Sequence, residues 1–83
     1  MTRDDVLELV RTHLADELGV DASNISDSTN LRDDLEADSL DLYTLLQEVE
    51  DRLGIKIADD QAADIETVGQ AVDLILATGS QGG

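Results

Sequence analysis

Apolar residues recur at helical spacing in three stretches of the chain. Residues 2–18, 38–53 and 67–78 each place an apolar side chain every three or four positions, which predicts three amphipathic helices. A fourth, short helix is expected over residues 59–64, with Asp59 as its cap. The predicted fold is therefore all-α: a small four-helix bundle with three longer helices, one short helix and a long first loop.

The residues at the ends of these stretches are typical of helix caps. Thr2 is a favoured N-cap, and Gly19 and Gly54 follow the first two stretches as C-terminal stops. Thr67 and Gln70 have the spacing of a capping box. The caps therefore agree with the boundaries that the apolar pattern predicts.

Residues 19–37 lack a helical pattern and are rich in turn-forming residues, which predicts a loop. Four apolar residues interrupt it: Val20, Ile25, Leu31 and Leu35. Because a structureless loop of this length is uncommon in a compact domain, we expect these four to anchor it to the core. Short helical turns are expected near residues 22–25 or 31–35.

The charge balance narrows the possible partners. Lys and Arg number 5 and Asp and Glu number 20, so the net charge is −15. Nucleic acid is not expected as a partner because its phosphates need a basic face, whereas basic protein surfaces would be attracted. No apolar run approaches the roughly 20 residues of a membrane span, and no signal peptide opens the chain. We therefore expect a cytoplasmic monomer without stable membrane insertion.

The sequence contains no catalytic arrangement. It has no cysteine, which excludes disulfides, zinc knuckles and thiol nucleophiles. The single histidine, His13, lies at the edge of the first apolar stripe, and we interpret it as a half-exposed helix residue. The carboxylates of residues 33–41 lack the glycine and ligand spacing of an EF-hand loop, so no dedicated metal site is expected.

Ser39 stands out because of its neighbours. The second helix is expected to start at Asp38 or Ser39, and Asp38 can itself serve as the N-cap, so the serine is not needed for that role. The next residue, Leu40, is apolar but falls on the side of the helix opposite the apolar stripe. A hydroxyl followed by an outward leucine on an acidic helix indicates an attachment point that another protein grips.

Residues 33–41, Asp-Asp-Leu-Glu-Ala-Asp-Ser-Leu-Asp, resemble the attachment motif of acyl carrier proteins. The resemblance extends over nearly the whole chain, from Gly19-Val20 at the start of the long loop to Thr67-Val68 at the last helix. It implies that Ser39 receives a covalent 4′-phosphopantetheine arm in the holo form, and that acyl cargo is carried on the arm as a thioester. It further implies a non-catalytic carrier for fatty acid biosynthesis, with a carrier domain over residues 1–78 and a flexible tail over 79–83.

The resemblance also implies partners. These are a holo-acyl-carrier-protein synthase, which is a phosphopantetheinyl transferase, and fatty acid synthesis enzymes with basic docking patches. Such enzymes are expected to recognise the second helix in fast encounters that salt weakens. The expected recognition residues are Asp38, Leu40, Asp41, Glu48, Glu50 and Asp51.

The chain departs from the family pattern at four positions. The family commonly has glycine at the position of Glu36 and proline at that of Ala58. Many members have an acid at the position of Thr44 and an apolar residue at that of Gln47. The last two departures lie on the outer face of the second helix, where they would change partner preference without removing the serine.

Two other interpretations remain open. Type II polyketide synthase carriers share the fold and the motif. An acidic interaction module that regulates a basic partner would also suit the charge, although it gives no reason for Leu40 beside Ser39. A calcium-responsive protein is disfavoured because the loop pattern is missing.

Overall fold

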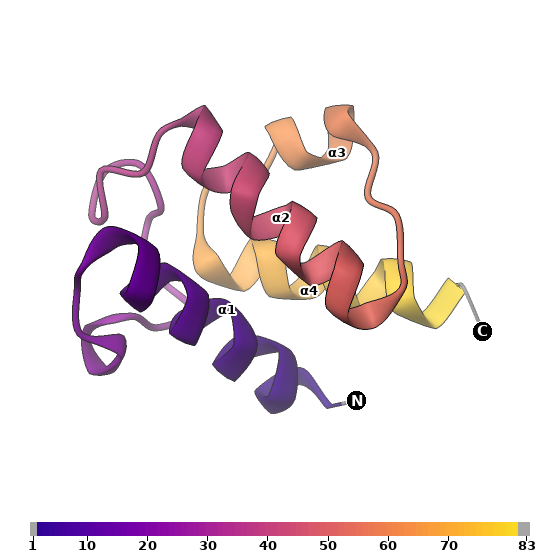
Figure 1. Cartoon of the computed structure of the whole chain (residues 1–83), viewed down its shortest axis with the longest axis horizontal. Coiled ribbons are helices and arrows are strands. Elements are labelled where there is room, and N and C mark those ends of the chain that lie inside the picture. The colour runs from indigo at the N-terminus through magenta and orange to yellow at the C-terminus, as the bar shows by residue number, and fades with distance from the viewer. Residues whose placement is uncertain (1, 82–83) are drawn as a thin grey trace.

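The computed structural model describes residues 2–81, which fold into four helices and one short 3₁₀ turn (Figure 1). In chain order the elements are α1 (Arg3–Leu18), η1 (Ala22–Asn24), α2 (Ser39–Leu53), α3 (Asp59–Ala63) and α4 (Val68–Gln81). Within residues 2–81 the only β-type pairing is an isolated bridge between Asn30 and Thr67. The predicted all-α fold, with three longer helices and one short helix, is confirmed.

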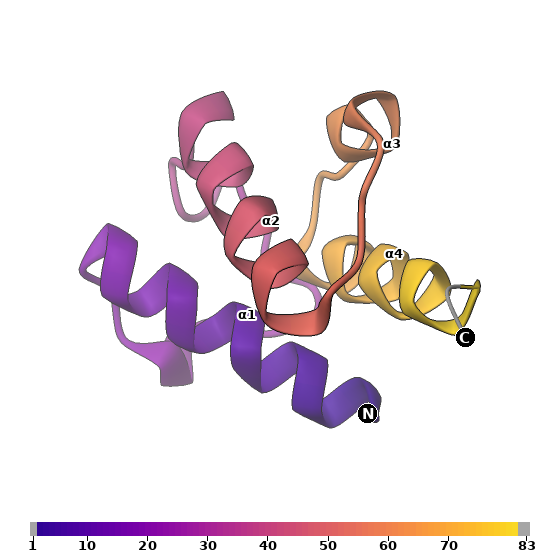
Figure 2. The ribbon, with the colours of Figure 1, turned by 45° about the vertical axis from the view of Figure 1, so that its right-hand side comes forward.

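The three long helices pack their apolar stripes against one another. Helices α1 and α2 run side by side in opposite directions, and α4 packs against α1 (Figures 1 and 2). Helix α3 stands apart from α1 and follows a linker that leaves the end of α2 (Figure 2). The buried side chains of the long helices are Val6, Val10 and Leu14 of α1, Leu42, Leu45, Leu46 and Val49 of α2, and Val68, Ala71, Val72 and Ile75 of α4. No helix within residues 2–81 combines the length and the apolar character needed to cross a bilayer.

The predicted caps fix most helix ends. Thr2 forms a capping box at the start of α1, and the Thr67 hydroxyl accepts a hydrogen bond from the Gln70 amide at 3.2 Å. Gly19 and Gly54 adopt the left-handed conformation, with φ of 70° and 66°, as the C-caps of α1 and α2. Glycine takes this conformation without the steric cost that a Cβ imposes.

Two predicted boundaries are wrong. Asp59 does not cap α3, because Ala58 is the N-cap and forms no side-chain cap hydrogen bond. Asp59 instead lies in the first helical turn, where its charge is favourable at the positive end of the helix dipole. Helix α4 continues to Gln81 rather than ending near Thr78. Residues 82–83 of the expected flexible tail lie outside the described residues.

The long loop is held by its apolar residues, as predicted. Ile25 and Leu31 are buried, with 2% and 0% of their surface exposed, and Val20 and Leu35 are half-buried against the core. The turn expected near residues 22–25 is η1. Residues 31–35 form hydrogen-bonded turns instead of a helix. The loop is therefore an ordered part of the bundle.

Polar contacts tie this loop to both ends of the chain. The Leu31 amide donates to the Glu66 carbonyl at 2.9 Å, which joins the loop to the segment before α4. The Arg3 guanidinium contacts Asp27 of the loop at 2.9 Å and Asp73 of α4 at 3.1 Å. These contacts hold in place the loop that precedes α2.

Glu36 adopts a strained backbone conformation just before α2. Its φ is +56°, and it is the only non-glycine residue with positive φ among residues 2–81. Contacts between Cβ and the backbone disfavour this conformation for all residues except glycine, at a cost of roughly 1–2 kcal/mol. Acyl carrier proteins, which the motif resembles, commonly have glycine at this position. The positive φ explains that preference, because glycine has no Cβ. Ala58, with φ of −69°, already adopts a conformation open to proline.

Replacing Glu36 with glycine should stabilise the protein. We expect Glu36→Gly to raise the free energy of unfolding in urea by about 1 kcal/mol, because relief of strain exceeds the entropy cost of glycine. Glu36→Ala is the matched control, since it removes the same charge but keeps the Cβ. Equal stability of the two variants would show that charge, and not backbone strain, determines the effect.

Candidate functional site

Two acidic residues build the start of α2. The Asp38 carboxylate accepts a hydrogen bond from the Asp41 amide at 3.0 Å, and the Asp41 carboxylate accepts one from the Asp38 amide at 3.1 Å. This reciprocal capping box satisfies backbone donors that the helix itself cannot pair. Asp38 is therefore the N-cap, as the sequence suggested, and both carboxylates have a structural role.

Ser39 is the first residue of α2 and is exposed. Because Asp38 performs the capping, the Ser39 hydroxyl is left without a hydrogen bond to any of residues 2–81. The hydroxyl of Thr44, in contrast, is used within the helix, where it donates to the Leu40 carbonyl at 2.9 Å. The site thus offers an uncommitted serine oxygen held on a fixed backbone.

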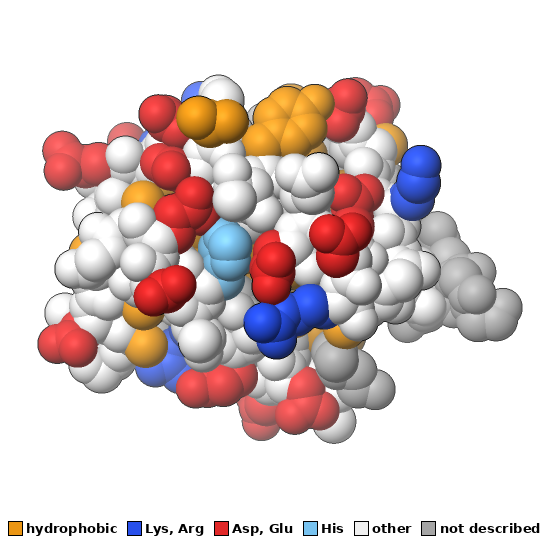
Figure 3. Space-filling view, viewed as in Figure 1, with side chains coloured by type: hydrophobic (Ala, Val, Ile, Leu, Met, Phe, Trp, Pro, Cys, Tyr) orange, Lys and Arg blue, Asp and Glu red, His pale blue; other side chains and the backbone are white. Residues whose placement is uncertain are grey.

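Two large apolar side chains stand in solvent beside this serine. Leu40 is 72% exposed and Tyr43 is 58% exposed. In the space-filling view, exposed hydrophobic groups gather along the upper edge, with acidic groups on either side (Figure 3). The predicted outward position of Leu40 is confirmed, and an exposed leucine and tyrosine surrounded by carboxylates form a surface suited to contact with another protein.

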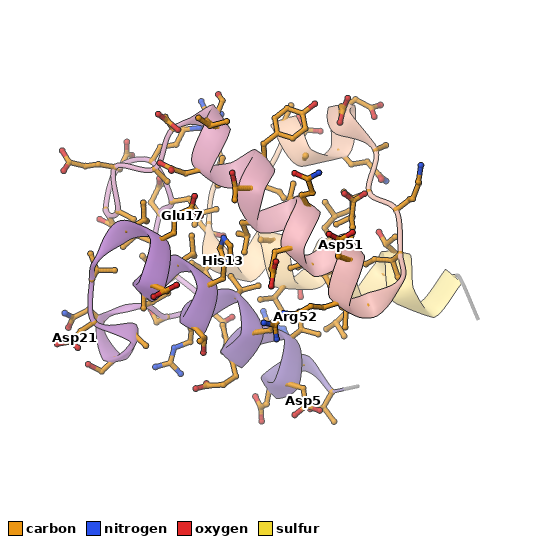
Figure 4. The ribbon with its side chains drawn as sticks, viewed as in Figure 1. Asp5, His13, Glu17, Asp21, Asp51 and Arg52 are labelled. Atoms are coloured by element: carbon orange, nitrogen blue, oxygen red, sulfur yellow. The ribbon has the colours of Figure 1, made fainter. Side chains whose placement is uncertain are left out.

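The other expected recognition residues differ in how freely they present their charge. Glu48 pairs with Arg52 at 2.7 Å. Glu50 is half-buried and accepts a hydrogen bond from the Ile57 amide at 2.8 Å, so it holds the linker after α2. Asp51 is exposed and forms no ion pair with residues 2–81 (Figure 4). Of these three carboxylates, Asp51 is therefore the most available for contact with a partner.

A small cavity opens next to Ser39, between α2 and α3. Its volume is ≈180 Å³, and its wall contains Arg32, Ser39, Leu42, Tyr43, Leu46, Asp59, Ala62 and Ala63. The nearby Asp59 carboxylate raises the pKa of the Tyr43 hydroxyl, because it stabilises the protonated phenol. Arg32 and Asp59 carry no sequence signal for this site, because only the folded chain brings them to Ser39. Tyr43 lies one helical turn after Ser39 on α2, so helical spacing already places it there.

The other candidate groups lie away from this site. The His13 ring contacts the Glu17 carboxylate at 2.7 Å on α1, and 18% of its side chain is exposed (Figure 4). Within residues 2–81, no three His, Cys, Asp or Glu side chains are grouped in a way that could hold a metal ion.

The residues around Ser39 fit a covalently attached arm. Ser39 is exposed and its hydroxyl makes no hydrogen bond to residues 2–81. A phosphodiester can therefore form on its oxygen without disrupting a helix cap or opening the core. The adjoining cavity offers the root of such an arm a wall that includes the aliphatic side chains of Leu42, Leu46, Ala62 and Ala63.

Comparison with known proteins agrees with this geometry. Residues 8–75 match the family model described as "Phosphopantetheine attachment site". The acyl carrier protein of Rubrobacter xylanophilus is 43% identical over 76 residues, which cover 92% of this chain and 94% of that protein.

Two solved structures have the same fold. One is an acyl carrier protein from Enterococcus faecalis, with 40% identity, a TM-score of 0.79 and coverage of 94% of this chain and 99% of that chain. The other is hexanoyl acyl carrier protein from the actinorhodin polyketide synthase of Streptomyces coelicolor, with 26% identity, a TM-score of 0.77 and coverage of 100% and 95%. The chain thus belongs to the acyl carrier protein family, whose members are non-catalytic carriers of acyl thioesters with 4′-phosphopantetheine attached to a serine.

Proposed function

We propose that Ser39 is the serine that carries the 4′-phosphopantetheine arm, and that this carrier serves fatty acid biosynthesis. The observation that carries the proposal is the free, exposed Ser39 hydroxyl at the start of α2, beside an N-cap that does not need it. Ser39 also lies within the matched residues 8–75. Attachment at this oxygen would leave the capping box and the helix intact.

The chain's own residues would hold and present the arm. Ser39 Oγ supplies the ester oxygen, while the Asp38 and Asp41 caps keep that oxygen at the end of a rigid helix. When attached, the arm supplies a terminal thiol on which the acyl group is carried as a thioester. Leu40 and Tyr43, both exposed next to the attachment point, offer apolar contact to the enzyme that receives the arm.

The cavity beside Ser39 limits how much cargo the closed molecule could shelter. Its ≈180 Å³ is smaller than the roughly 300–1,000 Å³ of typical ligand pockets. A long acyl chain would therefore need α2 and α3 to separate. The short α3, which has no side-chain cap, is the element best suited to move.

The acidic outer face of α2 is the proposed docking surface for enzymes with basic patches. Opposite charges raise the rate of encounter more than they raise affinity, which suits a carrier that must also leave quickly. Asp51 and Glu48 are proposed as contact residues. Asp38 and Asp41 would contact partners in addition to capping α2. Glu50 would do so in addition to its hydrogen bond with the Ile57 amide in the linker.

The acid-rich second helix and the Asp-Ser-Leu motif at residues 38–40 favour a fatty acid carrier over a peptide-synthetase carrier, but type II polyketide carriers share this motif. The Enterococcus carrier is 40% identical to this chain, and the actinorhodin polyketide carrier 26%. The type II polyketide role remains the second candidate, since that carrier shares the fold.

Incubation with coenzyme A and a phosphopantetheinyl transferase should add one arm to the wild-type protein and none to Ser39→Ala. Intact-mass spectrometry followed by peptide mapping measures both the gain and its position. Ser23→Ala, which removes another exposed hydroxyl, is the matched control and should gain the arm normally. Modification of Ser39→Ala, or mapping of the arm to another residue, would refute the attachment site.

Reversal of one charge on α2 should slow the docking enzymes. We expect Asp51→Lys to lower kcat/KM about two- to tenfold with a transferase and with an acyl-loading enzyme, because it replaces attraction by repulsion. Asp21→Lys is the control, since this exposed residue lies in the loop after α1, away from Asp51 (Figure 4). Equal rates for the two variants with both enzymes would exclude a docking role for this part of α2.

The pathway assignment can be tested by competition. We expect the malonyl-loaded holo protein to serve as the extender for a fatty acid ketosynthase, which transfers its acyl primer to the malonyl carbon with loss of CO₂. Its kcat/KM should be about tenfold higher than with a type II polyketide ketosynthase, a difference of about 1.4 kcal/mol. Product chains are identified by mass spectrometry. The opposite preference would favour the polyketide role and leave the attachment at Ser39 unaffected.

A further inference from the structure

Arg32 is the only positively charged residue, among those described, in the wall of the cavity beside Ser39. The turn that carries it is well fixed. The Asn30 side-chain oxygen accepts a hydrogen bond from the Arg32 amide at 3.0 Å, and the preceding residue, Leu31, is fully buried. The fold therefore brings a guanidinium close to a serine that lies seven residues further along the chain.

The guanidinium of Arg32 is also uncommitted, although the protein has a net charge of −15. Arg3, Arg11 and Arg52 each pair with a carboxylate at 2.7 to 3.1 Å. Arg32 forms no ion pair with any carboxylate of residues 2–81, even though Asp59 lies in the same cavity wall. An unpaired cation in so acidic a chain is available for another anion.

We propose that Arg32 binds the phosphodiester that joins the arm to Ser39. This inference rests on the proposed attachment at Ser39, which would place one negative charge on the non-bridging phosphate oxygens next to the serine oxygen. A guanidinium matches the geometry of phosphate oxygens and can donate two hydrogen bonds to them. No other cation of the described residues lines this cavity, and the nearby Asp38 and Asp59 would repel the phosphate.

The pairing would have a consequence for the carrier. A phosphodiester held by Arg32 has its arm rooted over the cavity between α2 and α3, rather than free to turn in all directions from the helix end. Arg32 would thus be a positioning residue for the root of the arm. Because the pair is exposed, its strength should fall as salt is added.

The contact is tested by a double-mutant-type cycle, in which the effect of a substitution on unfolding in urea is compared between the apo and holo forms. Arg32→Gln should lower the ratio of folded to unfolded protein in urea about 1.5- to 5-fold more in the holo form than in the apo form. Lys56→Gln is the matched control, because Lys56 is also exposed and unpaired within residues 2–81 but does not line the cavity. The control should change both forms equally.

The phosphorus resonance of the arm gives a second readout that does not depend on stability. In the wild-type holo protein its chemical shift should differ from that in Arg32→Gln, and should move toward that value as salt rises. Lys56→Gln should behave as wild type, and Arg32→Lys should lie between wild type and Arg32→Gln because it keeps the charge but loses the two-pronged geometry.

The outcomes separate the two proposals. If mapping finds the arm on Ser39 but the cycle shows no coupling and the resonance is unchanged by Arg32→Gln, the phosphate contact is refuted and the attachment stands. Equal effects of Arg32→Gln and Lys56→Gln would likewise refute it, since only overall charge would matter. If no arm is found on Ser39, both proposals fail together.

Discussion

The capping box at the start of α2 is the interaction on which the site depends. The carboxylates of Asp38 and Asp41 accept hydrogen bonds from each other's backbone amides, so the start of α2 is capped without the Ser39 hydroxyl. In many helices a serine in this region would cap the helix, and its oxygen would then be occupied. Here the two aspartates cap the helix, so the Ser39 hydroxyl stays exposed while its backbone is held in the first turn of α2.

The negative charge of the chain serves more than one purpose. Some carboxylates build the fold: Asp27 and Asp73 hold Arg3, and Glu50 holds the amide of Ile57. Asp51 and others remain exposed and are available to basic surfaces. A residue in the first group cannot be changed without affecting the fold, so the acidic face of α2 is less uniform as a recognition surface than its composition indicates.

The core of the described residues is tightly packed except for one small cavity between α2 and α3. The stripes of α1, α2 and α4 bury only aliphatic side chains, and the long loop is fastened to them by Ile25 and Leu31. Helix α3, in contrast, spans five residues and meets α2 across a small cavity next to Ser39. A firmly capped helix start and an adjoining cavity would both suit the proposed attachment at Ser39, because the serine would have to be recognised while the cargo varies.

Local patterns of residues were enough to predict the helices, most of their caps and the exposed serine, because these features depend on neighbours within four residues. Apolar spacing identified the buried faces, and the order Asp38-Ser39-Leu40 indicated which hydroxyl was free. Three features became apparent only in the folded chain: the role of Glu50, the position of Arg32 beside Ser39 and the left-handed backbone at Glu36. Each of these depends on contacts or chain directions set by packing between distant segments, which no local pattern of residues encodes.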